Sequence, residues 1–420
     1  MELRTALIVP ALTLVLLTAT PVTAHAGGDH PPGLFGTPRA VPAWALPAYT
    51  HYLVRGLTLQ PTGQQPGAST ATGISRAFNP AVSVNALMLG AFFNGEPLPG
   101  EHEEETAGTE EEHDHAEEHE HGHGTIEEGL HLQEAEIQLT SFVDPYLKGD
   151  LIIGFHGGET EVEVACVTTQ ALPFGWQARV GKTYAPFGKQ NLLHTHQYPF
   201  VEAPLIHQML FGGTLAEFGG ELSYLFPTPF FLQATAAVYN GDNLFFAADS
   251  PRNLSGLGRL EALWDLSENT TLELGGSAVT GKSGWSGGYE QVAGADMTLK
   301  WRPLRRSLYT QAEWQLEYLQ GSRLPEEGMD RAFGGLTTHL RYRFARTWWL
   351  GTRFERTGIP DGGEEGLTRY ALQFAWVPGE FELWRLQYSL TVPEHEDEPT
   401  FGALMLQMTF TIGSHPAHTY

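Results

Sequence analysis

The segment at residues 101–123 holds the side chains best suited to binding a metal ion. Six histidines stand there among eleven glutamates and aspartates, with no lysine, arginine or large apolar residue. The histidines are His102, His113, His115, His119, His121 and His123. Imidazole and carboxylate groups suit borderline divalent cations such as Zn²⁺, Ni²⁺ and Cu²⁺. The composition therefore favours metal contact, and the alternative is a charged surface loop that only keeps the protein soluble.

The spacing of these histidines predicts weak binding. Such a polar segment cannot bury enough apolar surface to fold by itself, so we expect a solvated loop. Most of its imidazoles stand two residues apart, so an extended chain must curl before three or four of them reach one tetrahedral ion. That ordering has an entropic cost. We therefore expect exchangeable Zn²⁺ sites and no fixed cofactor.

The N-terminus indicates export from the cytoplasm. Arg4 precedes an apolar run from Ala6 to Leu17, and Ala24-His25-Ala26 matches a cleavage signature, so residues 1–26 are predicted to be a signal peptide. No later stretch offers eighteen consecutive apolar residues, as a membrane helix would need. Residues 27–77, rich in Gly, Pro, Thr and Gln, are predicted to be a poorly ordered periplasmic extension or small plug.

A period of two runs through the rest of the chain. Between Leu404 and Ile412 every second residue is apolar, and Gln407, Thr409 and Thr411 stand between them. Strands with one apolar and one polar face are typical of a membrane barrel with lipid outside and water inside. A soluble β-sandwich also alternates, but its strands are usually shorter. Residues 78–420 are therefore predicted to form an all-β, antiparallel transmembrane barrel.

The predicted strands number sixteen, each long enough to cross a bilayer at a tilt. Their approximate ranges are 78–94, 130–142, 146–156, 160–171, 175–184, 214–226, 230–240, 254–266, 269–281, 289–301, 307–320, 331–345, 347–358, 366–377, 381–392 and 401–413. Short turns alternate with connections that are mostly longer and polar. Because short turns belong on the periplasmic side, the connection at 95–129, with its histidine-rich segment, is predicted to be the first external loop.

Several short motifs resemble a group of bacterial outer-membrane proteins named zinc-regulated receptors or porin-like proteins. The motifs are Phe78-Asn79-Pro80, the acidic histidine-rich loop, Val180-Gly181-Lys182 with Ala185-Pro186-Phe187-Gly188, and the ending from Thr411 to Tyr420. The second of these elements is also similar to one in phosphate-selective porins. The resemblance covers roughly residues 75–420 and implies a place in the outer membrane of a Gram-negative-type bacterium, in contact with its lipid.

The resemblance also suggests a constriction. In sixteen-strand porins the third loop folds into the barrel and narrows the pore. By that likeness the connection at 185–213 would place His194, His196, Glu202 and His207 at the narrowest point. The alternative is that these loop histidines face solvent.

Charged residues predicted to face the barrel interior are unevenly distributed. Those assigned to line the pore are Glu134, Glu136, Glu217, Glu221, His339, Arg341, Arg343, Arg353, Arg369 and Arg385. The acids belong to the first half of the barrel and the bases to strands near its end. Opposed walls would create a transverse field across a water-filled lumen. Alternatively, ion pairs could knit together a plugged lumen.

These features together predict an outer-membrane channel for small solutes or ions, with an external loop that captures zinc or related divalent cations. The alternative is a closed barrel that acts as a metal-binding surface protein or receptor. The net charge is −25, and about half of it comes from the first loop. The sequence contains no stripe of basic residues of the kind that binds nucleic acid. No catalytic motif stands out, so we expect no enzyme, although some outer-membrane enzymes use barrels. A homotrimer is possible.

Overall fold

The computed structural model describes residues 80–95, 126–243, 245–246, 252–282, 288–324, 331–360, 366–395 and 399–413. The predicted signal peptide, the extension at 27–77 and the histidine-rich segment at 101–123 lie outside these residues. The predictions about their structure therefore stay predictions.

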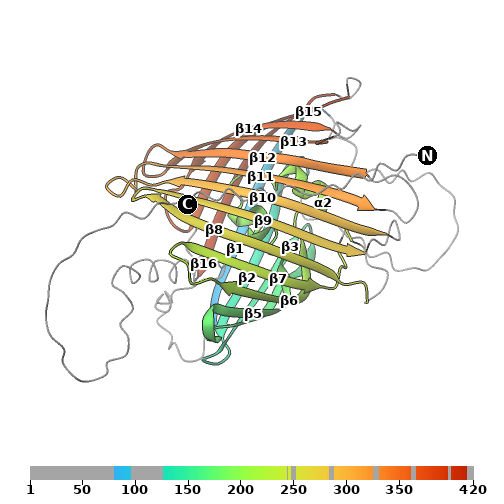
Figure 1. Cartoon of the computed structure of the whole chain (residues 1–420). Helices are drawn as coiled ribbons and strands as arrows, with labels where there is room; N and C mark the ends of the chain where they lie inside the picture. The colour runs from blue at the N-terminus through green and yellow to red at the C-terminus, as the bar shows by residue number, and fades with distance from the viewer. Residues whose placement is uncertain are drawn as a thin grey trace, which may run out of the picture. The chain divides into compact units, whose positions relative to one another are not determined.

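Sixteen antiparallel strands close into a barrel in sequence order, and β1 pairs with β16 to complete the wall (Figure 1). The strands are β1 (Ala81–Asn94), β2 (Gly129–Phe142), β3 (Leu147–His156), β4 (Glu159–Thr169), β5 (Trp176–Tyr184), β6 (Ala216–Leu225), β7 (Phe231–Tyr239), β8 (Ser255–Ser267), β9 (Thr270–Lys282), β10 (Tyr289–Trp301), β11 (Gln311–Leu324), β12 (Arg331–Arg343), β13 (Trp348–Thr357), β14 (Leu367–Trp376), β15 (Glu382–Pro393) and β16 (Phe401–Gly413). The predicted fold class and strand number are confirmed.

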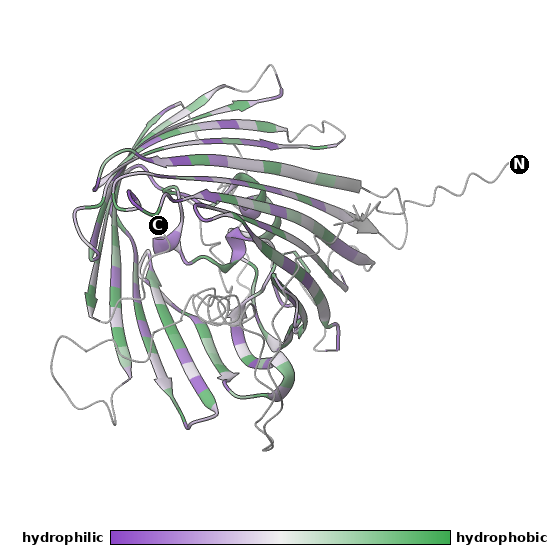
Figure 2. Ribbon diagram, turned by 60° about the vertical axis from the view of Figure 1, so that its left-hand side comes forward, coloured by the Kyte–Doolittle hydropathy of each residue, from purple (hydrophilic) through white to green (hydrophobic). Residues whose placement is uncertain are grey.

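The outer face of the wall is apolar and the inner face is polar along most strands. In β14, Leu372 is 54% exposed while its neighbour Gln373 is 3% exposed. Figure 2 shows the resulting alternation of hydrophobic and hydrophilic bands along the strands. The apolar outer face continues around the closed barrel. Such a face is stable in contact with lipid, because apolar side chains are more stable in hydrocarbon than in water.

Helical structure is sparse and short among the described residues. A turn between β4 and β5 contains η1 (Pro173–Gly175), and the connection between β5 and β6 contains η2 (Gln190–Leu192), η3 (Thr195–Gln197) and α2 (Leu205–Phe211). None of the helices in the described part of the chain has the length and hydropathy needed to span a bilayer. We call residues 185–215, the whole connection between β5 and β6, the docked loop.

The docked loop lies inside the barrel because its apolar side chains pack on the inner face of the wall. Phe187, Ile206, Leu210 and Phe211 belong to one buried cluster with inward-facing residues of β7 to β11. The wall residues of this cluster are Ala237, Tyr239, Leu257, Val279, Val292 and Leu319. The inner face is therefore apolar where α2 packs, a local exception to the polar lumen expected from sequence.

Candidate functional site

The histidine end of the docked loop packs against carboxylates of the barrel wall. His194 Nδ1 lies 3.2 Å from Glu136 Oε2 and 3.0 Å from Glu163 Oε2. His196 Nδ1 lies 3.2 Å from the same Glu136 oxygen. Both imidazoles are almost completely buried, at 3% and 2% exposure, and His194 stacks on the ring of Tyr184. The histidines thus lie inside the barrel, enclosed by wall and loop, and do not face bulk solvent.

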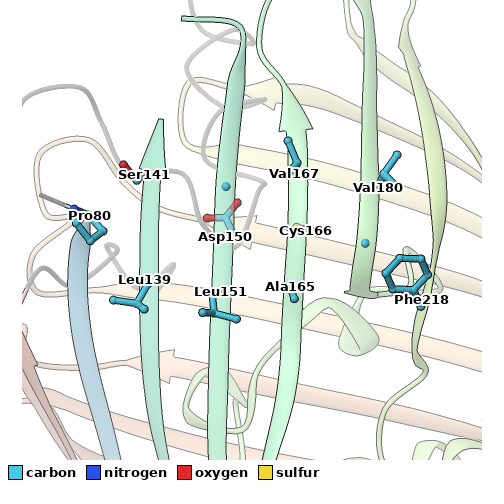
Figure 3. A pocket seen from close by; sticks show the side chains of 12 residues that line it. Pro80, Leu139, Ser141, Asp150, Leu151, Ala165, Cys166, Val167, Val180 and Phe218 are labelled. Atoms are coloured by element: carbon cyan, nitrogen blue, oxygen red, sulfur yellow. The ribbon is translucent and has the colours of Figure 1, made fainter. Parts of the chain in front are cut away.

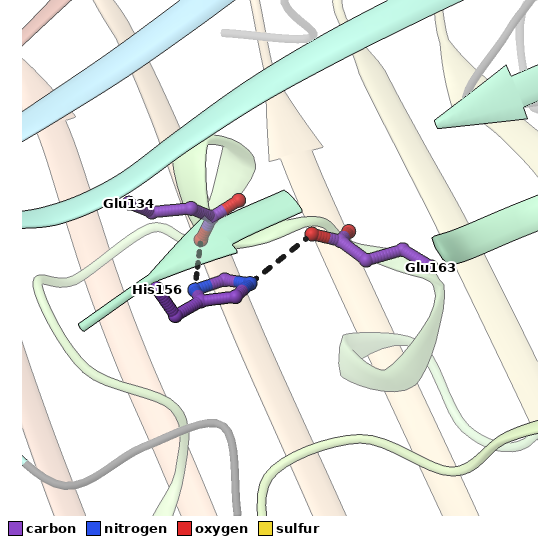
Figure 4. A group of neighbouring side chains, drawn as sticks. All are labelled: Glu134, His156 and Glu163. Carbon is purple, nitrogen blue, oxygen red and sulfur yellow. Dashed lines mark ion pairs between the residues drawn. The ribbon is translucent and has the colours of Figure 1, made fainter. Parts of the chain in front are cut away.

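A third histidine reaches the same place from the wall. His156 ends β3, and its Nε2 lies 3.4 Å from Glu163 Oε1 while its Nδ1 lies 4.0 Å from Glu134 Oε2 (Figure 4). The two carboxylate oxygens of Glu163 therefore face two different imidazoles. We call this group the His–Glu cluster; its members are Glu134, Glu136, His156, Glu163, His194 and His196.

Two irregularities in strand pairing turn these side chains inward. The β1–β2 register passes over Gln133, and the β3–β4 register passes over Glu163, so each strand carries one extra residue. Such a β-bulge re-aims the side chains next to it. In β2 the bulge shifts the inward phase, so that Glu134 and Glu136 point into the barrel while Leu132 before them points outward. The cluster is therefore built into the wall and not into a flexible tip.

The cluster strongly attracts positive charge. Burial alone would lower the pKa of His194, but Glu136 and Glu163 beside it raise that pKa to about 10. Three buried carboxylates within reach of one another require cations for balance, and a proton on an imidazole is one such cation. The donor set of imidazole nitrogen and carboxylate oxygen would suit a transition-metal ion equally well.

Another part of the docked loop carries an acid, Glu202, that meets the basic strands. Arg353 donates to Glu202 Oε1 at 2.8 Å and to its backbone carbonyl at 2.9 Å, and Arg369 Nη1 lies 3.4 Å from Glu202 Oε2. Gln387 and Ser389 donate to the same carboxylate at 3.2 and 3.0 Å. Burial alone would raise the pKa of Glu202, but the two arginines and these hydrogen bonds hold it below its ordinary value.

Two further stretches of the docked loop, around Lys189 and around His207, are fastened to a third part of the wall. Lys189 pairs with Glu273, and its backbone N–H donates to Glu317 Oε1 at 2.9 Å. His207 Nε2 lies 3.0 Å from the other oxygen of Glu317. Gly188 has a φ of +63°, and a Cβ there would lie 1.8 Å from Glu317 Oε1. A glycine is thus required both by the backbone and by the carboxylate beside it.

The structure places all the predicted pore-lining residues on the inner face of the wall. Arg341 and Arg343 are half-buried, and the others are buried. The buried ones are Glu134, Glu136, Glu217, Glu221, His339, Arg353, Arg369 and Arg385. Their position agrees with the predicted register, although the docked loop covers several of them.

The predicted separation into an acidic and a basic wall is incomplete. Arg179 on β5 lies 3.3 Å from Glu221, and Arg259 on β8 lies 2.7 Å from Asp296. These arginines also point inward, in the half of the barrel that was expected to be acidic. The sequence interpretation gives no role to the bases interleaved with the glutamates of that half, and Arg179 and Arg259 are not part of it. The charge contrast across the lumen is correspondingly smaller.

A groove of about 590 Å³ is lined by residues of β2 to β6 and by Pro80, which precedes β1 (Figure 3). Its lining includes Leu139, Leu151, Val167, Val180 and Phe218, which alternate with the inward-facing residues of their strands. These side chains belong to the outer, apolar face of the wall. The groove is thus separate from the lumen and suited to contact with apolar groups in the membrane.

Comparison with known proteins identifies the fold. No family model matches the chain. A protein of Aquifex aeolicus, described as uncharacterized, is 27% identical over 332 residues, covering 70% of this chain and 71% of that protein. The anion-selective porin from Comamonas acidovorans superposes with a TM-score of 0.54 at 10% identity, over 79% of this chain and 100% of the porin.

Two further solved structures give the same result. OprB of Pseudomonas putida superposes with a TM-score of 0.51 at 9% identity, covering 80% of this chain and 94% of that chain. The outer membrane channel DcaP of Acinetobacter baumannii superposes with a TM-score of 0.51 at 11% identity, covering 80% and 99%. The barrel has the fold of outer-membrane porins. This agrees with the predicted place in the outer membrane.

The sequence singles out four of the six members of the His–Glu cluster but does not connect them. Glu134 and Glu136 were assigned to the pore lining, and His194 and His196 to the constriction, without any link between the two pairs. His156 was not singled out, because one histidine before a turn carries no signal by itself. Two adjacent polar residues, Gln133 and Glu134, interrupt the alternation in β2, and this interruption could have located the bulge.

Proposed function

We propose that this protein is an outer-membrane channel for small solutes or ions, and that its external mouth collects zinc or a related divalent cation. The observation that supports it best is the docked loop, which is held inside a porin-like barrel by contacts to several parts of the wall. A loop anchored in this way can narrow a lumen without depending on its own stability.

Charged side chains on the inner face support a water-filled path beside the docked loop. The side chain of Arg341 on β12 is partly exposed and lies 2.7 Å from Glu313 on β11. Lys300 on β10 is 36% exposed and lies 2.8 Å from Glu313. Because these groups belong to the lumenal face of their strands, the solvent that reaches them lies within the barrel.

Topology supports a common mouth for metal capture and constriction. In a closed antiparallel barrel, every connection from an odd-numbered to an even-numbered strand leaves from the same end. The histidine-rich segment belongs to the β1–β2 connection, and the docked loop is the β5–β6 connection. Cations collected by residues 101–123 would therefore be concentrated at the end of the barrel where the docked loop enters.

The decisive test is single-channel conductance of the purified protein in a planar bilayer, with and without micromolar zinc on the loop side. We expect stable conductance steps that change when zinc is added. A variant lacking residues 101–123 should keep the steps and require a higher zinc concentration for any response. Steps that respond equally in both proteins would overturn the capture role, because imidazole and carboxylate of that segment would then be unnecessary.

A closed barrel that binds metal at its surface is the second candidate. The observation that favours it is the apolar cluster formed by α2 with β7 to β11, which fills part of the lumen with side chains. A well-folded protein that gives no conductance steps would support this candidate against the channel. The mass of the detergent-solubilised complex would test the proposed homotrimer in the same preparation.

A further inference from the structure

We propose that the His–Glu cluster is a binding site for divalent transition-metal ions, with two adjacent positions that share Glu163. The proposal concerns the wall and the docked loop alone. It requires neither metal capture by residues 101–123 nor conduction through the lumen, so it goes beyond the function proposed above.

The spacing of the ligand atoms matches a metal site. In tetrahedral zinc sites with metal–ligand bonds of about 2.0–2.1 Å, neighbouring ligand atoms are roughly 3.3 Å apart. The distance from His194 to Glu163 is 3.0 Å, from His194 to Glu136 is 3.2 Å, and from His156 to Glu163 is 3.4 Å. The separation of 4.0 Å between His156 and Glu134 involves the other ring nitrogen, Nδ1, so the imidazole or the Glu134 side chain must turn before both carboxylates share one ion with Nε2.

Glu163 is positioned to bridge two ions. Its Oε1 faces His156 and its Oε2 faces His194, so the carboxylate separates one set of ligands from the other. The ligand atoms of Glu134, His156 and Glu163 all lie within 4.8 Å of one another, and so do those of Glu136, Glu163 and His194. Mixed nitrogen and oxygen donors favour Zn²⁺ or a neighbouring transition ion over Ca²⁺, which prefers six to eight oxygens.

An unsatisfied carboxylate indicates that the cluster needs a cation. No hydrogen bond of good geometry reaches either oxygen of Glu134 within the described residues, although the side chain is only 1% exposed; its stabilising neighbours are His156 and, more weakly, the hydroxyl of Thr195. Burying a charged oxygen without a donor is costly, and a metal ion would remove that cost. This acid stands at a bulge, pointing toward His156, so its orientation is imposed by the wall.

The wall also leaves space for the ligands. Gly154 on β3 pairs with Glu136 across one strand boundary. A Cβ at this position would lie 2.0 Å from Glu163 Oε1 and 2.7 Å from His156 Nε2. Only a residue without a side chain allows the two ligands to occupy this place. A bound ion would then join His194 of the docked loop to β2 and β4, and would fix the loop in the lumen.

The test is equilibrium binding of Zn²⁺, and of Co²⁺ followed by its visible absorption, to refolded protein stripped with a chelator. The variant without residues 101–123 removes the histidine-rich segment from the measurement. We expect it to bind up to two ions per chain, with a Co²⁺ spectrum typical of nitrogen and oxygen ligands. Glu163→Gln in that variant should weaken binding by at least about tenfold, since even partners of metal ligands contribute that much.

The matched control is Glu313→Gln, which makes the same change at a buried lumenal acid outside the cluster. It should leave the affinity for zinc unchanged. If Glu163→Gln prevents folding, Gly154→Ala keeps every ligand and should weaken binding by crowding Glu163 and His156. Equal affinity in the Glu163→Gln or Gly154→Ala protein and in its parent would overturn the proposal.

The two metal proposals fail in different ways. If the intact chain binds zinc and the variant without residues 101–123 binds none, the cluster proposal is wrong and the capture proposal stands. If both bind the same number of ions and Glu163→Gln removes them, the cluster proposal stands and the capture proposal is wrong. Binding lost in steps, one from each change, would support both.

Discussion

Replacing Glu202 with glutamine should release the docked loop from the arginines of β13 and β14. The carboxylate is 9% exposed and pairs with Arg353, whose side chain is 2% exposed, so little water screens the interaction. Removing one partner of a buried ion pair costs about 3–5 kcal/mol where the other charge stays buried without compensation, and here Arg353 keeps a second carboxylate, Glu355, at 3.0 Å. Glutamine keeps an oxygen that can accept from Ser389, so we expect the lower value. About 3 kcal/mol corresponds to roughly a hundredfold increase in the undocked population.

Hydrogen exchange of two loop amides measures this population directly. The Val201 N–H donates to Gln387 and the Leu205 N–H donates to Glu355, both at 2.9 Å, so both amides are protected only while the loop is docked. The control is Glu394→Gln, which breaks an ion pair with Arg356 whose side chain is 50% exposed. Exposed pairs contribute at most about 1 kcal/mol, so this control should leave the two amides protected. Unchanged protection in the Glu202→Gln protein would refute the buried-tether argument.

Three further predictions follow from other parts of the structure. Gly188→Ala should expose the Lys189 amide to exchange at least about tenfold faster, because the left-handed backbone alone costs a side chain roughly 1–2 kcal/mol and Glu317 must also move. Between neutral pH and pH 4.5 the ionisation of Glu202 should not change the stability of docking. Below pH 4.5 docking should weaken, because the pKa of Glu202 in the docked loop lies below its ordinary value of 4.5. Hydrogen exchange of the Val201 amide across this pH range measures the docked population. Leu372→Arg, on the lipid-facing side of β14, should cost about 2–4 kcal/mol of folding free energy in vesicles, measured by urea titration.

The barrel could be predicted from sequence because lipid and water impose a period of two on every strand. Where the alternation is clean, as from Leu404 to Ile412, the observed strand has the predicted bounds. The largest shift is in β11, which begins at Gln311 and not at 307. The Arg306 N–H donates to Pro303 and the Thr310 N–H donates to Arg306, so these residues form a turn. Their alternating pattern did not distinguish a turn from the start of a strand.

The cluster could not be predicted in the same way, because it depends on contacts between distant segments. His194 and Glu136 are 58 positions apart in the chain, and only the barrel closure and the docked loop bring them together. Nor does alternation alone show that Ile206 and Phe211 would find an apolar area on the inner face of β7 to β11. A period of two assigns a residue to one face of the wall, but it does not say what packs against that face.

The charges of the docked loop complement the wall at each place where the two meet. Its acid, Glu202, meets Arg353, while Lys189 and His194 meet carboxylates on other strands. Reversing the loop across the lumen would bring like charges together and leave buried charges unpaired, a penalty of several kcal/mol. The wall charges therefore do more than line a path for solutes, since they select one orientation of the loop. Solutes then encounter mainly the charges that the loop leaves partly exposed, such as Lys300 and its partner on β11. The selectivity of the channel should accordingly follow these exposed pairs more closely than the total charge of the chain.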